Sequence, residues 1–313
     1  MALTLLEAAK LRNNPLQLGV IETFARESVI LEMLPFLETK SDSYSFNREA
    51  TLGRADFRAL NEEYTEDVGK LDKVTETLTI LGGFSDVDRV LVKTSADSIN
   101  DVRAIYDTMK AKAIALKYTK TFVKGDCESS PKEFDGLQVR CGSGDQLIAA
   151  GSTGGGDALS LAILDQAIDA VDGSPDVILM NKTMARRMSV GARASAVAGD
   201  VQYTIDQFGK RVTTYNGIRI GVVDTDESNE LILPFTEACP GGGAATGTSI
   251  YIVKFGLGTH VCGLECGPIT VEDLGIQNNV CYRTLQEWIC GMACFHPRSV
   301  ARLYGISDAA ITA

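Results

Sequence analysis

Residues 41–79 read SDSYSFNREATLGRADFRALNEEYTEDVGKLDKVTETLT, a long polar segment with almost nothing to bury. Its two ends alternate as strands do and its middle is acidic (Tyr44 and Phe46; Thr75, Thr77 and Thr79; Glu62, Glu63, Glu66 and Asp67). This pattern predicts a two-stranded ribbon, which is marginally stable in water because it has no second layer to pack on. Such an arm makes sense if another copy of the chain covers it. The segment therefore indicates assembly rather than catalysis.

The composition is that of an ordinary globular protein. The chain has 313 residues, of which 45% are hydrophobic and 23% charged, and this length favours about two domains. Its formal net charge is −11, from 41 acidic and 30 basic residues. This balance argues against binding nucleic acid over the whole surface, but it leaves room for a local basic stripe. With no secretory signal and no apolar run of the roughly 20 residues that span a bilayer, the protein is expected to be soluble, without a membrane partner.

The cysteines are expected to be buried free thiols. Eight of them stand at positions 127, 141, 239, 262, 266, 281, 290 and 294. The chain is large and shows no export signal, so a reducing cytosol explains them better than a disulfide framework does.

A long amphipathic helix is predicted over residues 97–124. Asp97 or Ser98 can cap its start, and Gly125 can end it. One heptad row, widened by its neighbours, is apolar and is expected to form the buried face (Val102, Met109, Leu116 and Val123; Ile99, Ile105, Tyr106 and Ala113). The adjacent row is basic (Arg103, Lys110, Lys117 and Lys124). It is either a solvated face or a surface that contacts phosphates without reading sequence.

A compact α/β unit of about 100 residues is predicted after this helix. It contains an apolar helix ended by Gly173, the buried strand DVILMN (176–181), a helix over 182–198 and the hairpin RVTTY-NG-IRIGVV. In the hairpin, Asn216-Gly217 supplies the two positive φ angles of a type I′ turn. The later strand-like runs, from SIYIVKFG to NVCYRTLQEWICGMACFHP, are expected to cover the long helix. The α/β unit would then be an insertion into a second domain.

Catalytic and cofactor motifs were sought, and no catalytic or cofactor-binding residue is predicted. The chain has two histidines and no G-x-S-x-G motif. Its Gly-rich stretches at 142–145 and 151–157 match neither of the phosphate-binding sequence motifs, G-x-x-x-x-G-K-[ST] and G-x-G-x-x-G. They are interpreted as flexible connections. The closest approach to a metal site is a set of sulfur and nitrogen ligands (His260, Cys262, Cys266, Cys290, Cys294 and His296). Its C-x-x-x-C spacing and apolar surroundings favour packing, so no metal is predicted.

The chain resembles the major capsid (major head) proteins of tailed bacteriophages, which share the HK97-like fold. The resemblance spans essentially the whole chain and rests on the order of elements and on three local echoes: LTLLEAAKL followed by GVIE, DVILMN, and FHPRSVARLYGI. It implies an α+β capsid fold with four parts. These are an N-terminal arm (1–43), an extended β-hairpin loop (44–80), a peripheral domain with a long spine helix (81–145 and 248–296) and an α/β axial domain (146–247 and 297–313).

The resemblance also implies a structural protein rather than an enzyme, without a cofactor. Copies would assemble as hexamers and pentamers into an icosahedral head around double-stranded DNA, with the basic row Arg103, Lys110, Lys117 and Lys124 facing the DNA. The expected partners are a separate scaffolding protein, a portal, packaged DNA through non-specific contacts and, as an option, a decoration protein. The protein would assemble in the host cytoplasm and would be located in the capsid of the virion. An encapsulin-type compartment shell is the alternative, and a cytosolic metal-binding or hydrolytic enzyme is a more distant one.

Overall fold

The computed structural model describes residues 28–94, 102–191, 201–205, 211–277 and 280–312. The apolar spacing of residues 5–11 predicts a short amphipathic helix, but that segment lies outside these residues. The expected cap at Asp97 or Ser98 and the end of the helix predicted over 182–198 also lie outside them. The described part forms two bodies, each built on its own sheet, and a projecting hairpin.

The first body is a five-stranded sheet with one long helix on it. Its strands follow the order β1-β11-β13-β12, and β4 pairs with the other side of β13. The elements are α3 (Val29–Met33), β1 (Phe36–Glu38), β4 (Thr79–Asp88), α4 (Arg89–Thr94), α5 (Val102–Lys124), α6 (Leu137–Arg140), β11 (Val261–Glu265), β12 (Thr270–Gln277) and β13 (Cys281–Cys294). The late strands β11 to β13 cover α5, as predicted. Helix α5 also ends at Lys124 as expected, with the N–H of Gly125 bonded to the carbonyl of Thr121.

The buried face of α5 differs from the predicted heptad row. The buried side chains of α5 are those of Asp107, Ala111, Ile114, Ala115, Tyr118, Thr119, Thr121, Phe122 and Val123. Met109 is 60% exposed and Tyr106 is 46% exposed, so the prediction for the first half of the row is wrong. The small residues Ala111 and Ala115 let the helix approach the sheet closely. Tyr106 and Met109 lie beside the edge strand β4, where none of the described residues forms a second layer over them.

Aromatic side chains fill the core between α5 and the sheet. Tyr118 stands at the centre, with ring centroids 4.9 Å from Trp288, 5.6 Å from Phe134 and 6.1 Å from both Phe36 and Phe122. Tyr118 and Trp288 are almost fully buried. This cluster joins the late strand β13 to a helix more than 150 residues earlier, which only the folded chain brings together.

The second body is a seven-stranded sheet in the order β5-β14-β10-β6-β9-β8-β7. Its elements are β5 (Leu147–Ala149), α7 (Leu161–Asp169), β6 (Val177–Met180), α8 (Lys182–Gly191), β7 (Val201–Ile205), β8 (Arg211–Tyr215), β9 (Ile218–Val222), β10 (Thr248–Val253), η1 (Pro297–Ser299) and β14 (Val300–Ile306). Two predictions are confirmed here. Strand β6 is buried along its whole length, and the β8–β9 turn has φ of 48° at Asn216 and 80° at Gly217.

Two other element predictions are wrong. The run SIYIVKFG was expected beside the long helix, but β10 pairs with β6 and β14 in the second body. Its six residues are all buried, which an inner strand of this sheet requires. The two apolar clusters of residues 78–93 predict a single strand from the sequence, but β4 ends at Asp88, whose carboxylate accepts the N–H of Val90 at 2.7 Å and so begins α4.

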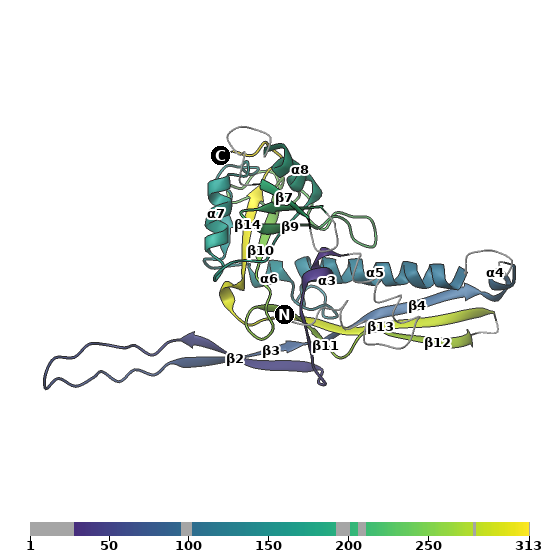
Figure 1. The fold of residues 1–313 in the computed structure, drawn as a ribbon, viewed down its shortest axis with the longest axis horizontal. Helices are drawn as coiled ribbons and strands as arrows, with labels where there is room; N and C mark the ends of the chain where they lie inside the picture. Colours follow the sequence, from purple (N-terminus) through teal and green to yellow (C-terminus); the bar gives the residue numbers. More distant parts are fainter. Residues whose placement is uncertain (1–27, 95–101, 192–200, 206–210, 278–279, 313) are drawn as a thin grey trace.

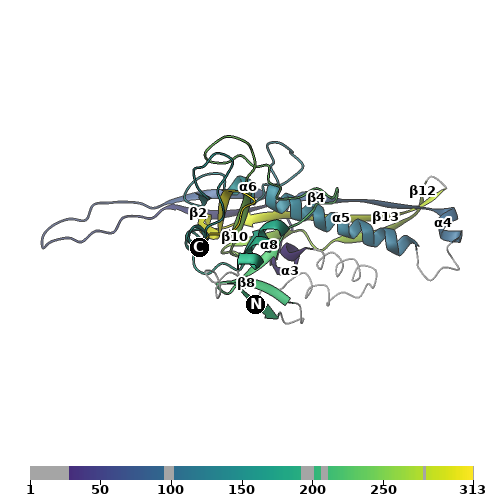
Figure 2. The same ribbon diagram turned by 90° about the horizontal axis from the view of Figure 1, so that it is seen from above.

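The hairpin and the first body extend along one line, with the second body rising from its middle (Figure 1). The hairpin tip and α4 mark opposite ends of the molecule in both views (Figures 1 and 2). Among the described residues, no helix combines the length and apolar character needed to cross a membrane.

Asp107 is an acidic residue in the interface between α5 and the sheet, and it gives a pH-dependent prediction. It is 5% exposed, and burial raises the pKa of its carboxyl despite a hydrogen bond from Thr284 and the nearby Arg103. The charged form is therefore disfavoured in the folded protein and lowers the stability at neutral pH; this penalty disappears as the pH falls through the raised pKa. We expect Asp107→Asn to raise the free energy of unfolding at pH 7 by up to about 1 kcal/mol. Urea titrations should show the gain shrinking as the pH is lowered, and a gain that grows would contradict the prediction.

Candidate assembly surfaces

The hairpin is formed by β2 (Ser43–Thr51) and β3 (Lys70–Thr77), paired antiparallel from Ser43↔Thr77 to Glu49↔Leu71. The sequence prediction of a two-stranded ribbon over residues 41–79 is therefore confirmed. These strands form a separate two-stranded sheet, and beyond Thr51 the chain continues without regular strands until Lys70.

The base of the hairpin is fixed to the body by aromatic and cationic contacts. The rings of Phe46 and Tyr44 lie 4.5 Å and 6.0 Å from that of Phe295. The Arg48 guanidinium donates to the carbonyl oxygens of Cys294 and Phe295. Because β13 ends at Cys294, these contacts join the start of the hairpin to the end of the longest strand of the body.

A buried ion pair holds the returning strand. The two guanidinium nitrogens of Arg140 donate to the two carboxylate oxygens of Glu76 at 2.6 and 2.7 Å. The side chains are 15% and 13% exposed. This parallel, two-bond geometry fixes direction as well as distance, so the hairpin leaves the body at a defined angle.

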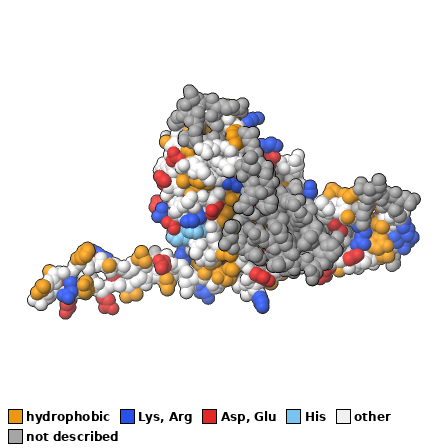
Figure 3. Space-filling view, viewed as in Figure 1, with side chains coloured by type: hydrophobic (Ala, Val, Ile, Leu, Met, Phe, Trp, Pro, Cys, Tyr) orange, Lys and Arg blue, Asp and Glu red, His pale blue; other side chains and the backbone are white. Residues whose placement is uncertain are grey.

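None of the residues that the structure describes covers the tip of the hairpin, residues 52–69. Its large apolar side chains are exposed (Leu52 80%, Phe57 107%, Leu60 94%, Tyr64 66% and Val68 73%). Local contacts give it shape: Asp67 accepts the N–H of Arg54 at 2.9 Å, and the Arg58 guanidinium stacks over the Tyr64 ring at 5.3 Å. Figure 3 shows hydrophobic side chains interspersed with acidic ones along this arm. Exposed apolar side chains gathered in this way mark an interaction surface.

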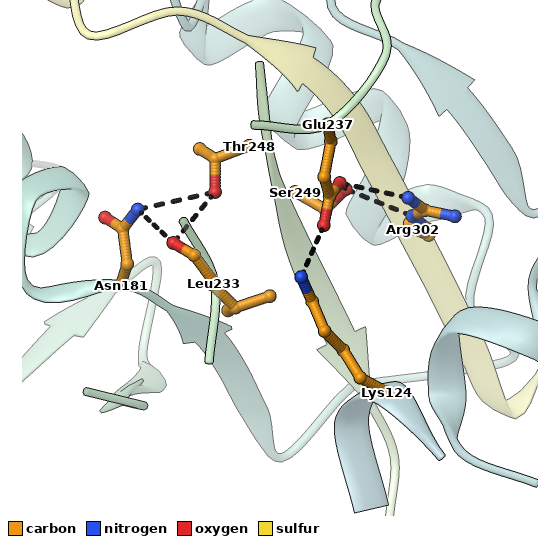
Figure 4. A network of polar contacts seen from close by, with 7 residues as sticks. All are labelled: Lys124, Asn181, Leu233, Glu237, Thr248, Ser249 and Arg302. Atoms are coloured by element: carbon orange, nitrogen blue, oxygen red, sulfur yellow. Dashed lines mark hydrogen bonds and ion pairs between the residues drawn. The ribbon is translucent and has the colours of Figure 1, made fainter. Parts of the chain in front are cut away.

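A buried polar network joins the end of α5 to the second sheet (Figure 4). Lys124, the last residue of α5, lies 3.5 Å from one carboxylate oxygen of Glu237. The other oxygen accepts from Arg302 of β14 at 3.0 Å and from the Ser249 hydroxyl of β10. The side chains of Glu237 and Arg302 are 9% and 11% exposed. In this way one carboxylate ties the long helix to two strands of the other body.

Hydrogen bonds of Asn181, next to this network, hold the loop that precedes β10 in place. The Asn181 amide donates to the carbonyl of Leu233 at 3.0 Å (Figure 4). The Asn181 carboxamide oxygen also caps α8 by accepting the N–H of Met184 at 2.7 Å. Sequence reasoning assigned no role to Asn181, Glu237 or Arg302. The sequence offered one signal for Asn181: it stands between a buried strand and a helix, a position at which Asn commonly caps the helix.

The predicted basic stripe lies along α5, but most of it is engaged within the chain. Arg103 pairs with Asp273 at 2.8 Å, Lys117 with Glu133 at 2.8 Å and Lys124 with Glu237. The fourth residue, Lys110, lies over the backbone at Gly83. The carboxylate partners offset three of the four positive charges locally, and sequence spacing along one helix could not reveal partners from other elements.

The sulfur and nitrogen ligands considered for a metal site do not come together. Among the described residues, no group of three or more His, Cys, Asp or Glu side chains is arranged to hold a metal ion. The two histidine rings are 6.2 Å apart, and His260 contacts the Ser299 hydroxyl through Nδ1. Burial raises the pKa of Cys262 to about 12 and also raises that of Cys290, which keeps both thiols protonated. Both cysteines are fully buried and act as small apolar side chains.

The Gly-rich stretch 151–157 contacts a second Gly-rich loop, residues 239–249. The N–H of Gly155 bonds to the carbonyl of Gly242 at 3.1 Å, and the Thr246 hydroxyl donates to the carbonyl of Gly155 at 2.6 Å. A Cβ on Gly241 would lie 2.2 Å from the Ser152 carbonyl oxygen. Glycine is therefore required here for close backbone approach, a reason that the interpretation as flexible connections had missed.

Comparison with known proteins agrees with this architecture. A family model described as "Major capsid protein GP7" matches residues 14–167, close to half of the chain. The chain has the HK97-like capsid fold. No curated protein matches the sequence. The residues matched by the family model include the hairpin and the whole of α5.

Solved structures of low sequence identity share the fold. The SrpI encapsulin of Synechococcus elongatus PCC 7942 is 16% identical with a TM-score of 0.64, covering 100% of this chain and 99% of that one. The capsid of a native GTA particle is 13% identical with a TM-score of 0.62, covering 91% of each chain. A structure of Mycobacterium phage Bobi is 14% identical with a TM-score of 0.57, covering 90% of this chain and 91% of that one.

Proposed function

We propose that this protein is the major capsid protein of a tailed bacteriophage. Its copies assemble as hexamers and pentamers into an icosahedral head that encloses double-stranded DNA. The observation that carries this proposal is the hairpin: it is fixed at its base by Phe295 and Arg140, yet no described part of the chain covers its apolar tip. Heterologous contacts between identical copies can cover the tip and, when they close, give rings and shells.

The proposal is tested by purifying the expressed protein with and without a scaffolding protein and imaging it by negative stain. Closed particles of uniform diameter are the expected result. A monodisperse monomer under all conditions, including scaffold co-expression, would contradict the proposal.

An encapsulin-type compartment is the second candidate, and the coverage of the Synechococcus structure over both full chains favours keeping it. The match to the major capsid protein family favours the phage head. The two differ in content: nuclease-resistant DNA in purified particles supports the head, whereas a co-purifying enzyme without DNA supports the compartment. A metal-dependent hydrolase is a more distant candidate, and stoichiometric zinc that survives dialysis would revive it.

The expected domain division is part of this proposal, with one boundary moved. We keep the N-terminal arm (1–43) and the extended loop (44–80) as predicted, although α3 and β1 of the arm and the first two residues of β4, Thr79 and Ile80, belong to the first body. The axial domain corresponds to the second body and the peripheral domain to the first. Because β10 lies in the second sheet, we place the return to the peripheral domain after Val253 rather than at residue 248. We further propose a scaffolding protein, a portal and, optionally, a decoration protein as partners, with assembly in the host cytoplasm.

We also propose that the basic row of α5 faces the packaged DNA, and we expect it to make only a small contribution to DNA binding. Replacing Arg103, Lys110, Lys117 and Lys124 by Gln should lower the DNA content per particle only modestly, because carboxylates already offset three of the charges. Quantitative PCR on purified heads measures this content, and Lys40→Gln with Lys132→Gln provides a control on exposed lysines elsewhere. Unchanged DNA content together with unchanged particle stability would refute the stripe.

A further inference from the structure

The chain passes between the two bodies through two crossovers that contact each other. Residues 254–260 lead from β10 of the second body to β11 of the first, and residues 295–299 lead back from β13 to β14. The backbone N–H of Phe295 in the second crossover donates to the carbonyl of His260 in the first at 3.2 Å. The two crossovers therefore form one unit, here called the inter-body joint.

The inter-body joint contains both histidines of the chain, one in each crossover. The ring centroids of His260 and His296 lie 6.2 Å apart, and the rings are tilted by 76° to each other. Both side chains are partly exposed, and Figure 3 shows histidine side chains at the surface where the second body meets the first. Protons from solvent can therefore reach both rings, and histidine is the side chain that changes its charge between about pH 5 and pH 8.

His296 makes a hydrogen bond that requires a neutral ring. It is the N-cap of η1, and its Nδ1 accepts the backbone N–H of Arg298 at 3.2 Å. A ring nitrogen accepts a hydrogen bond only while it carries no proton, and both nitrogens of a charged imidazole are donors. Protonation of His296 therefore removes the cap from η1, the segment that leads into β14.

His260 also favours the neutral form. Its Nδ1 lies 3.1 Å from the hydroxyl oxygen of Ser299, which is fully buried. Burial lowers the pKa of His260, and the nearby Lys254 lowers it further. The unfolded chain therefore binds this proton at higher pH than the folded one. The stability that neutral His260 contributes is present above about pH 6.5 and is lost as the pH falls below that value.

The charged groups around the inter-body joint balance one another while the rings are neutral. The carboxylate of Asp176 accepts the backbone N–H of Phe255, and the Lys254 ammonium donates to a backbone carbonyl. Three cations and three carboxylates face the two rings, from the second body, from η1 and from strand β2 of the hairpin (Lys254, Arg298 and Arg48; Asp172, Asp176 and Glu49). Two bound protons therefore leave the inter-body joint with an excess charge of +2.

We propose that His260 and His296 make the inter-body joint a proton-binding site, which is closed while both rings are neutral and loosens when they are charged. Protonation removes the cap of η1 and places like charges on two neighbouring rings. The network of Lys124, Glu237 and Arg302 contains no histidine, so the two bodies stay in contact while the crossovers open. This inference concerns the single subunit and does not depend on the proposed function.

Hydrogen exchange of the full-length protein tests the inter-body joint. Exchange is followed by mass spectrometry at about pH 7.5 and about pH 5.5, a range in which histidine titrates, and protection is corrected for the intrinsic rates. Peptides over residues 254–260 and 295–301 report on the joint. A peptide over β6, which is buried along its whole length and has no titratable side chain, is the internal reference. Two variants accompany the unchanged protein. In His296→Asn the carboxamide oxygen caps η1 at either pH, and His296→Ala has no cap at either pH.

Protection of the joint peptides in the unchanged protein should fall about fivefold or more at the lower pH, which is the usual value of a helix cap. Most of this fall should disappear in His296→Asn, whereas His296→Ala should already be poorly protected at the higher pH. Constant protection in the unchanged protein would overturn the proposal, even if a variant failed to fold. A fall of the same size in His296→Asn, or in the β6 reference, would also overturn it, because the acid effect would then not come from the histidines of the joint.

Discussion

Shortening the hairpin is expected to abolish shell formation while leaving the subunit folded. In the variant, residues 50–70 are replaced by Asn-Gly, which joins the paired residues Glu49 and Leu71 through a two-residue type I′ turn. The tip loses its exposed apolar side chains, but Tyr44, Phe46, Arg48 and Glu76 remain at the base. Because the removed residues contact no core side chain, the unfolding midpoint should change little, whereas particles should disappear from sedimentation profiles.

A same-length control separates the shape of the loop from its chemistry. Replacing Leu60, Tyr64 and Val68 by Ser keeps the hairpin length and removes much of the apolar surface of the tip. We expect this control to assemble poorly but detectably, since the charges remain. Normal shells from the shortened variant would refute the central role of the hairpin.

Removing the Glu237 carboxylate is expected to give the largest loss of stability. In Glu237→Ala, Arg302 and Lys124 lose the carboxylate to which both are bound, and the side chain of Arg302 is 11% exposed. Truncating one partner of a buried ion pair costs about 3–5 kcal/mol, because the remaining charge is desolvated without compensation. The loss should appear as a lower midpoint of denaturant unfolding.

The conservative variant Glu237→Gln tests this explanation. Its amide oxygen can still accept from Ser249 or Arg302, so the expected loss is about half that of the Ala variant. Arg302→Met combined with Glu237→Leu removes both buried charges and should recover part of the stability, since a well-packed apolar pair avoids the desolvation cost. Equal losses in the Ala and Gln variants would show that packing, not charge, holds the two bodies together.

The elements that were predicted correctly depend on neighbours close in sequence. Asn216-Gly217 defines its turn because these two residues accept positive φ. The apolar run of DVILMN is buried whatever lies next to it. The polar alternation at both ends of residues 41–79 predicted the ribbon, because no other element is required for its pairing. The order of these elements also supported the family resemblance.

The sequence by itself therefore determined the hairpin, the long helix, the core strand of the α/β unit and the absence of a recognisable catalytic motif. The tertiary structure decided which face of α5 is buried, that β10 joins the second sheet, and that Glu237 links Lys124 to Arg302. A periodic pattern gives the angular position of a side chain on its own helix, but it does not say where the covering sheet ends. Tyr106 and Met109 are exposed because β4 is an edge strand, and that edge exists only once distant strands have paired.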